Sequence, residues 1–276
     1  MKHLLLIGNI DGHSVPLIRY AGKLCVNMNL KLHILQIEKN NDPVLLSSPY
    51  YYNNVGFRID QNLAGKKKEL EDFVNKNTKD LIETEWLSYK LMKGNIESCL
   101  DKFINEEKID LLIVRQAIFS NSGIHRNKIF SKLFMNVSDL PILIIPQNQI
   151  FKKLQKMVYF TMFTEEDSAN IYWLSQNFPG IEIKMIHFSK KEDDLKHKKW
   201  VDYLIQETEN INLTYQRLDD NIKDFVKKEI NSGEAEYDIL AKSTRKRKFW
   251  ERVTNPSTTL NLISDLEIPA LVFKKS

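Results

Sequence analysis

The strongest constraint in this sequence is a stretch that occurs twice, at residues 110–146 and again at residues 237–273. Each copy has an acidic residue, a short apolar run, a polar loop, a helical pattern, and a proline that leads into a second apolar run. The distance from Asp110 to Pro141 is 31 residues, and so is the distance from Asp238 to Pro269. A register kept without a gap predicts two structural units of the same design.

Short apolar runs alternate with helical patterns on either side of these copies, which predicts an α/β fold with parallel sheets. We expect one domain at residues 1–147 and a second at residues 155–276, joined by a short polar linker. The further runs expected to be strands are 3–10, 30–37, 86–92, 157–161, 181–188 and 213–218. The patterns expected to be helices are 14–28, 64–84, 96–106, 128–137, 167–177, 195–210, 222–231 and 257–263.

One stretch interrupts the alternation in the first half. Residues 39–63 contain two prolines, neighbouring serines and asparagines, and the run Tyr50-Tyr51-Tyr52. This composition predicts an irregular surface loop, although so long a connection is uncommon in a compact domain. The tyrosines could close over a ligand at the carboxyl ends of the strands, or they could pack against the other half.

Composition excludes several classes of protein. With 42% hydrophobic and 28% charged residues, the 276-residue chain has the values of a soluble globular protein. The net charge of +4 is too small to indicate a nucleic-acid partner, and no apolar run is long enough to cross a membrane. Cys25 and Cys99 both fall in helical patterns, which favours buried thiols in the reducing cytoplasm over a disulfide.

Two such halves resemble a tandem universal stress protein. The residues that carry the resemblance are 110–114, Asn255-Pro256-Ser257 with 268–272, and the run 11–14 after the first strand. The resemblance implies two five-stranded parallel sheets with the strand order 3-2-1-4-5. It also implies that the fifth strands, 142–145 and 270–273, pair across a pseudo-two-fold axis, so that the chain forms an intramolecular dimer. Apolar edge strands of this kind require a partner. Whether two whole chains also form a homodimer stays open.

Nucleotide-binding members of that family carry the pattern G-x2-G-x9-G-[ST] after the fourth strand. Glycines let backbone N–H groups approach phosphates, and the last hydroxyl stands at a helix N-terminus that favours anions. In the first half the four positions hold Arg115, Ile118, Lys128 and Ile129. In the second half they hold Ser243, Lys246, Pro256 and Ser257, so one of the eight positions matches. The family's acidic residue after the first strand is retained as Asp11, whereas the second half has Met162 there.

The candidate ligand-binding residues are therefore Asp11, Ser243, Lys246, Arg247 and Ser257. Each has an alternative interpretation. Asp11 and Ser257 could act as helix caps. The basic run at residues 242–248 could be an ordinary solvated loop, or its side chains could hold an anion in place of backbone amides.

Catalysis has little support in the sequence. The six histidines lack metal-ligand spacing, and neither a Gly-x-Ser-x-Gly elbow nor a paired cysteine motif occurs. We therefore predict a non-catalytic cytoplasmic stress-response protein with degenerate nucleotide sites, no cofactor, and an unidentified protein partner or small ligand. The alternative is an ATP-binding switch or weak ATPase in which the basic loop replaces the glycines.

Overall fold

The computed structural model describes residues 1–7, 14–38, 49–116, 140–147, 149–190, 195–208, 210–232, 236–243 and 266–274. For residues 49–63 and for residue 196 it describes the backbone alone. The predicted helices at 128–137 and 257–263 lie outside these ranges, as do residues 39–48.

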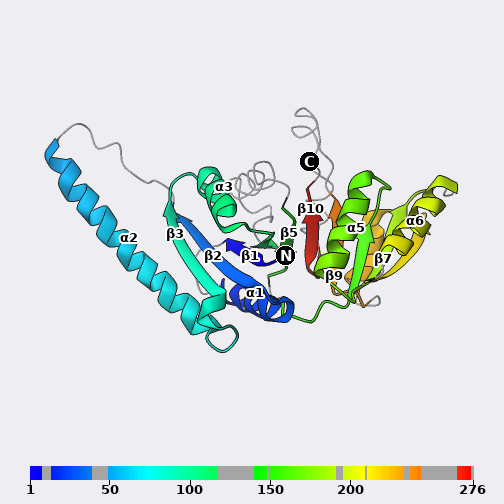
Figure 1. Cartoon of the computed structure of the whole chain (residues 1–276), viewed down its shortest axis with the longest axis horizontal. Helices are drawn as coiled ribbons and strands as arrows, with labels where there is room; N and C mark the ends of the chain where they lie inside the picture. Colours follow the sequence, from blue (N-terminus) through cyan, green and yellow to red (C-terminus); the bar gives the residue numbers. More distant parts are fainter. Residues whose placement is uncertain are drawn as a thin grey trace.

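The described strands form one ten-stranded sheet that runs through the whole molecule (Figure 1), in the order β3-β2-β1-β4-β5-β10-β9-β6-β7-β8. Neighbouring strands are parallel except at the centre, where β5 and β10 are antiparallel. The predicted α/β fold with a mostly parallel sheet is thereby confirmed. The strands of the first half are β1 (His3–Ile7), β2 (Lys31–Glu38), β3 (Leu87–Lys93), β4 (Leu111–Arg115) and β5 (Ile142–Ile145). Those of the second half are β6 (Lys156–Phe160), β7 (Glu182–Phe188), β8 (Asn212–Leu218), β9 (Ile239–Ser243) and β10 (Ala270–Phe273).

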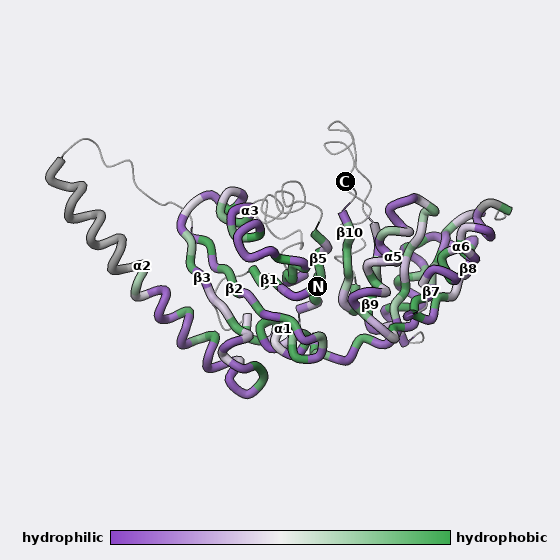
Figure 2. Tube along the Cα trace, in the orientation of Figure 1, coloured by the Kyte–Doolittle hydropathy of each residue, from purple (hydrophilic) through white to green (hydrophobic). Residues whose placement is uncertain are grey.

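Helices cover both faces of the sheet, and alternate residues of the central strands supply two hydrophobic cores. One core packs under α1, α2, α5 and α6, and it includes residues of both halves. The other core packs under α3 and α7 and also spans both halves. In Figure 2 the apolar colour is clear on the central strands β5 and β10. The helices are α1 (Val15–Met28), α2 (Pro49–Thr78), α3 (Ile96–Glu107), α5 (Glu165–Asn177), α6 (Leu195–Glu207) and α7 (Ile222–Phe225), with a 3-10 turn η2 (Thr84–Trp86) and a π-helical turn η4 (Val226–Ile230).

The acidic residue that opens each copy of the repeat has the same structural role in both halves. Asp110 Oδ2 accepts hydrogen bonds from the backbone N–H groups of Lys2, at 2.6 Å, and His3, at 3.0 Å. Asp238 Oδ2 accepts from the N–H groups of Gln155, at 2.8 Å, and Lys156, at 2.9 Å. Each carboxylate therefore fastens the start of the first strand of its half to the start of the fourth.

The prediction of an irregular loop at residues 39–63 is wrong where the structure describes it. Helix α2 begins at Pro49 and continues to Thr78, so it includes the three tyrosines, and it projects from the end of the sheet beside β3 (Figure 1). Tyrosine and asparagine are only slightly poorer helix formers than alanine, and proline is favoured at the first helical position. Once residues 64–78 are helical, each further residue gains a hydrogen bond, which lets the helix extend through a sequence that looks like a loop.

Asn95 is the N-cap of α3, and its side chain accepts a hydrogen bond from the N–H of Glu97 at 2.9 Å. Asn221 has the same role at the start of α7, where its side chain accepts from the N–H of Asp224. The predicted helix at 222–231 is divided, since its α-helical turn passes into a π-helical turn at Val226.

We expect Asp110→Ala and Asp238→Ala to destabilise the protein by similar amounts. Each variant removes a charged acceptor from two backbone N–H groups at a partly exposed site, which costs about 1–2 kcal/mol. Urea unfolding of the whole chain measures both changes. Asp101→Ala, on the exposed side of α3, is the control and should stay within about 0.5 kcal/mol of the parent. Unequal losses at the two positions would contradict their structural equivalence.

Candidate functional site

The candidate site of the second half lies at the carboxyl ends of β6 and β9. These strands are neighbours in the sheet although they are not consecutive in the chain. Doubly wound sheets bind ligands in the crevice outside such a pair, where the direction of winding reverses. Helix α5 starts directly after β6, so its first turn borders this crevice.

A buried carboxylate, Asp167, occupies the first turn of α5 and has 0% exposure. Its Oδ1 accepts from the hydroxyl of Tyr159 at 2.7 Å. Its Oδ2 accepts from the Thr161 hydroxyl at 3.1 Å and from the backbone N–H groups of Met162, at 2.9 Å, and Thr164, at 3.1 Å. The helix dipole also favours a negative charge at this end of α5. Asp167 is therefore an internal anion that takes up N–H groups at the start of the helix.

Ser243, the last residue of β9, turns its hydroxyl toward this carboxylate. The Ser243 Oγ accepts from Asn170 Nδ2 at 2.6 Å and lies 3.2 Å from the Tyr159 hydroxyl. It also donates to Asp167 Oδ1 at 3.3 Å. Burial raises the pKa of Tyr159 well above its ordinary value, and the charge of Asp167 adds to the effect, so the phenol stays a neutral donor. We call Tyr159, Asp167, Asn170 and Ser243 the Asp167 cluster.

Of the five predicted ligand residues, the structure describes Ser243 alone. It stands at the first glycine position of the nucleotide motif and belongs to the Asp167 cluster. The predictions for Asp11, Lys246, Arg247 and Ser257 fall outside the described residues. Met162 contributes its backbone N–H to Asp167, while its side chain is 39% exposed.

Sequence reasoning missed Asp167, although a signal for it exists. Thr164 is the N-cap of α5 and Asp167 follows it by three residues, which is the spacing of a capping box. That pattern indicates a helix start, but it does not reveal that β6 and β9 bring a phenol and a second hydroxyl to the same carboxylate.

The first half has a different set of side chains in the equivalent places. Leu4 pairs with Leu111 in the first half as Met157 pairs with Ile239 in the second, which fixes the correspondence. On that register, all four members of the Asp167 cluster are replaced together, and the polar group is specific to the second half. Through the strands, Leu6 and Arg115 correspond to Tyr159 and Ser243. Counted from the helix N-caps Ser14 and Thr164, Leu17 and Tyr20 correspond to Asp167 and Asn170.

A second polar group, in the first half, joins β1, β2 and β3 near their amino ends. His33 is fully buried, and its ring nitrogens lie 2.9 Å from His3 Nδ1 and 2.7 Å from Ser88 Oγ. Burial lowers the pKa of His33 to about 4, assisted by the nearby charges of His3 and Lys31. His33 is neutral, buried and at the amino ends of the strands. These properties indicate a role in the stability of the core rather than in proton transfer to a substrate.

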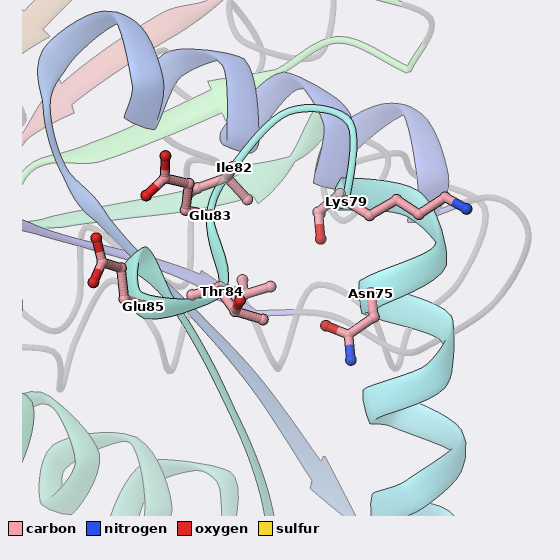
Figure 3. A pocket seen from close by; sticks show the side chains of 8 residues that line it. Asn75, Lys79, Ile82, Glu83, Thr84 and Glu85 are labelled. Carbon is pink, nitrogen blue, oxygen red and sulfur yellow. The ribbon is translucent and has the colours of Figure 1, made fainter.

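A cavity of about 530 Å³ lies where α2 ends and β3 begins (Figure 3). In that view the Lys79 side chain extends to one side and the carboxylates of Glu83 and Glu85 to the other, so these charges do not converge on a common point. The cavity also lies at the amino end of β3, away from the carboxyl ends where doubly wound sheets bind ligands. Its lining residues are Asn75, Thr78, Lys79, Ile82, Glu83, Thr84, Glu85 and Leu87.

Two further searches cover the described residues only. Among them, no group of three or more histidine, cysteine, aspartate or glutamate side chains is arranged to hold a metal ion. None of the described helices combines the length and apolar character that crossing a membrane requires.

The fold and the crevice define a class, the doubly wound α/β proteins, here with two similar halves that share one sheet. Within that class the chain has the fold of universal stress protein structures, which confirms the expected resemblance at the level of fold. A universal stress protein from Archaeoglobus fulgidus DSM 4304 is 12% identical with a TM-score of 0.58, and the match covers 99% of this chain and 96% of that one. A provisionally assigned universal stress protein from Pseudomonas aeruginosa UCBPP-PA14 is 11% identical with a TM-score of 0.57, over 99% and 93%.

The same fold also occurs outside stress proteins. The cytoplasmic domain of a prokaryotic cation chloride cotransporter is 10% identical with a TM-score of 0.50, over 98% of this chain and 94% of that one. A scan against protein-family models found no match, and a search of curated protein sequences found none either. At these identities the likeness concerns fold alone, and function has to be argued from the site.

We expect Asp167→Ala to destabilise the protein by about 3 kcal/mol or more, because it leaves several buried donors without an acceptor. Asp167→Asn should cost about 1–2 kcal/mol. Its amide oxygen can replace Oδ2, and its NH₂ group can donate to the hydroxyls of Tyr159 and Ser243. Urea unfolding measures both variants.

The control for this pair is Asp224→Ala, which removes a half-buried carboxylate from the first turn of α7. That change should cost about 0.5–1 kcal/mol. If Asp167→Ala cost no more than Asp224→Ala, the cluster would not be the buried, satisfied network described above.

Proposed function

We propose that this chain is a non-catalytic cytoplasmic protein of the universal stress type, with degenerate nucleotide sites, that acts in a stress response through a protein partner or a small ligand. One observation carries the proposal. Ser243, at a motif position where nucleotide-binding relatives have glycine, directs its side chain into the Asp167 cluster. A glycine there would leave the backbone open to a phosphate, whereas Ser243 adds a side chain that hydrogen-bonds within the Asp167 cluster.

Electrostatics argue in the same direction. The buried Asp167 carboxylate already accepts from the N–H groups of Met162 and Thr164. Both N–H groups lie beside the crevice, and because the internal anion already accepts from them they are not available to a bound phosphate. A phosphate brought to this crevice would also meet a like charge in a medium of low dielectric constant. These arguments support a site that has lost nucleotide binding.

The proposal includes the arrangement of the two halves. Each half contributes strands in the order 3-2-1-4-5 when the sheet is followed from its outer edge to the β5–β10 pair. We infer a pseudo-two-fold intramolecular dimer, supported by that order and by the equal roles of Asp110 and Asp238. Buried free thiols at Cys25 and Cys99 support the cytoplasmic assignment.

The test is calorimetric titration of the whole chain with ATP and Mg²⁺. We expect no ATP binding with a Kd below ~1 mM. We expect Ser243→Gly alone to leave the ATP affinity unchanged, because Asp167 remains in place.

The competing model is a nucleotide switch that relies on the basic run at 242–248. It predicts submillimolar binding that Lys246→Ala weakens about tenfold and that added salt also weakens. Lys198→Ala, in α6, is the matched control, and loss of affinity at Lys246 alone would overturn the proposal.

A further inference from the structure

Phe163 has an unusual backbone conformation. Its φ angle is +56°, in the left-handed region that bulky residues rarely adopt. Phe163 N–H donates to the Thr161 hydroxyl at 3.1 Å, and the N–H groups of Met162 and Thr164 on either side donate to Asp167. The short segment between β6 and α5 is therefore held by hydrogen bonds that keep Phe163 in a strained conformation. Strain of this kind tends to occur at functional sites.

The Phe163 ring is enclosed by four other rings. It stacks on His197 with a centroid distance of 4.1 Å and an interplanar angle of 8°. Trp200 meets it edge-on at 5.2 Å, and His187 and Tyr215 are tilted against it at 4.7 and 5.6 Å. We call the space bounded by His187, His197, Trp200 and Tyr215 the aromatic slot.

The walls of the aromatic slot come from three elements, β7, β8 and α6, and its occupant comes from the segment after β6. The backbone carbonyl of Thr161 lies 3.2 Å from His187 Nδ1, so one wall is tied to the segment that carries Phe163. Phe163 itself is partly exposed and its neighbour Met162 is exposed. Part of Phe163 is therefore in contact with solvent, so the aromatic slot is not sealed inside the core.

We propose that Phe163 is an internal plug of the aromatic slot, and that the slot binds a planar aromatic or heteroaromatic ring when the plug moves out. Three features support this. The slot already holds one flat ring between a stacked imidazole and an edge-on indole, which are the geometries that aromatic pairs favour. The plug is in a conformation from which departure relieves strain. Two imidazole walls offer nitrogen atoms to the polar edge of a heteroaromatic ring.

This inference deepens the small-ligand part of the proposed function by naming the class of ligand, but its test does not depend on ATP. The probe is indole, a planar ring without a phosphate. Phe163→Gly removes the plug and also the strain, because glycine adopts positive φ freely. We expect this variant to bind indole at least tenfold more tightly than the parent chain, which has to displace its own ring. Calorimetric titration measures both affinities. Adding His197→Ala to Phe163→Gly should abolish the gain.

The matched control is Phe188→Ala. Phe188 is a partly exposed ring in extended backbone, and it meets Phe160 and Phe225 edge-on on the other face of the sheet. This variant should show no gain in indole affinity. Equal gains from Phe163→Gly and Phe188→Ala, or none from Phe163→Gly, would overturn the inference.

A second measurement needs no variant and applies even if Phe163→Gly fails to fold. Indole titrated into the parent chain should shift the proton resonances of His197 and Phe163 in NMR spectra, because the stacked pair separates. Unchanged resonances at the solubility limit of indole would contradict the plug. Tight ATP binding that Lys246→Ala weakens would overturn the proposed function and leave the slot untouched, so the two failures are distinguishable.

Discussion

The antiparallel pairing of β5 with β10 is the interaction on which the rest of the structure depends. Each strand has four residues, all of them buried, and each would otherwise be the bare apolar edge of its own half. Pairing Leu143 with Leu271 closes both edges at once and makes the two cores continuous across the molecule. The Gln116 side chain adds a hydrogen bond to the carbonyl of Leu266 at 2.8 Å, near the same junction. The outer edges, β3 and β8, carry charged residues instead, which is the usual protection of an edge that stays unpaired.

Equivalent scaffolds have let the two halves diverge at their crevices. In the second half Tyr159 faces the small side chain of Ala241, whereas in the first half Leu6 pairs with Ile113. Alanine is smaller than isoleucine and leaves more room beside its partner, and the Tyr159 phenol requires a polar partner because its hydroxyl is buried. Asp167 is that partner, and its charge in turn requires the donors around it. The change from isoleucine at position 113 to alanine at position 241 is thus linked to the whole Asp167 cluster.

Much of the architecture could be predicted from the sequence because it rests on local patterns. The alternation of apolar runs with helical patterns depends on residues close together in the chain, and the described part of the structure has it as expected. The helix at residues 49–63 could not be predicted in this way, because small propensities along a polar stretch do not decide between loop and helix. The site was predicted in part. Counting from the repeat identified Ser243, but its partner Asp167 lies 76 residues away and is brought to it by the sheet.

The central claim is that the two halves are one structural unit joined by β5 and β10, and native-state hydrogen exchange tests it most directly. If the claim holds, the backbone amides of β5 and β10 exchange as slowly as those of β1, β4, β6 and β9, because all of them open together in global unfolding. Faster exchange confined to β5 and β10, with the other four strands still protected, would mean that the halves separate without unfolding. That result would contradict the account.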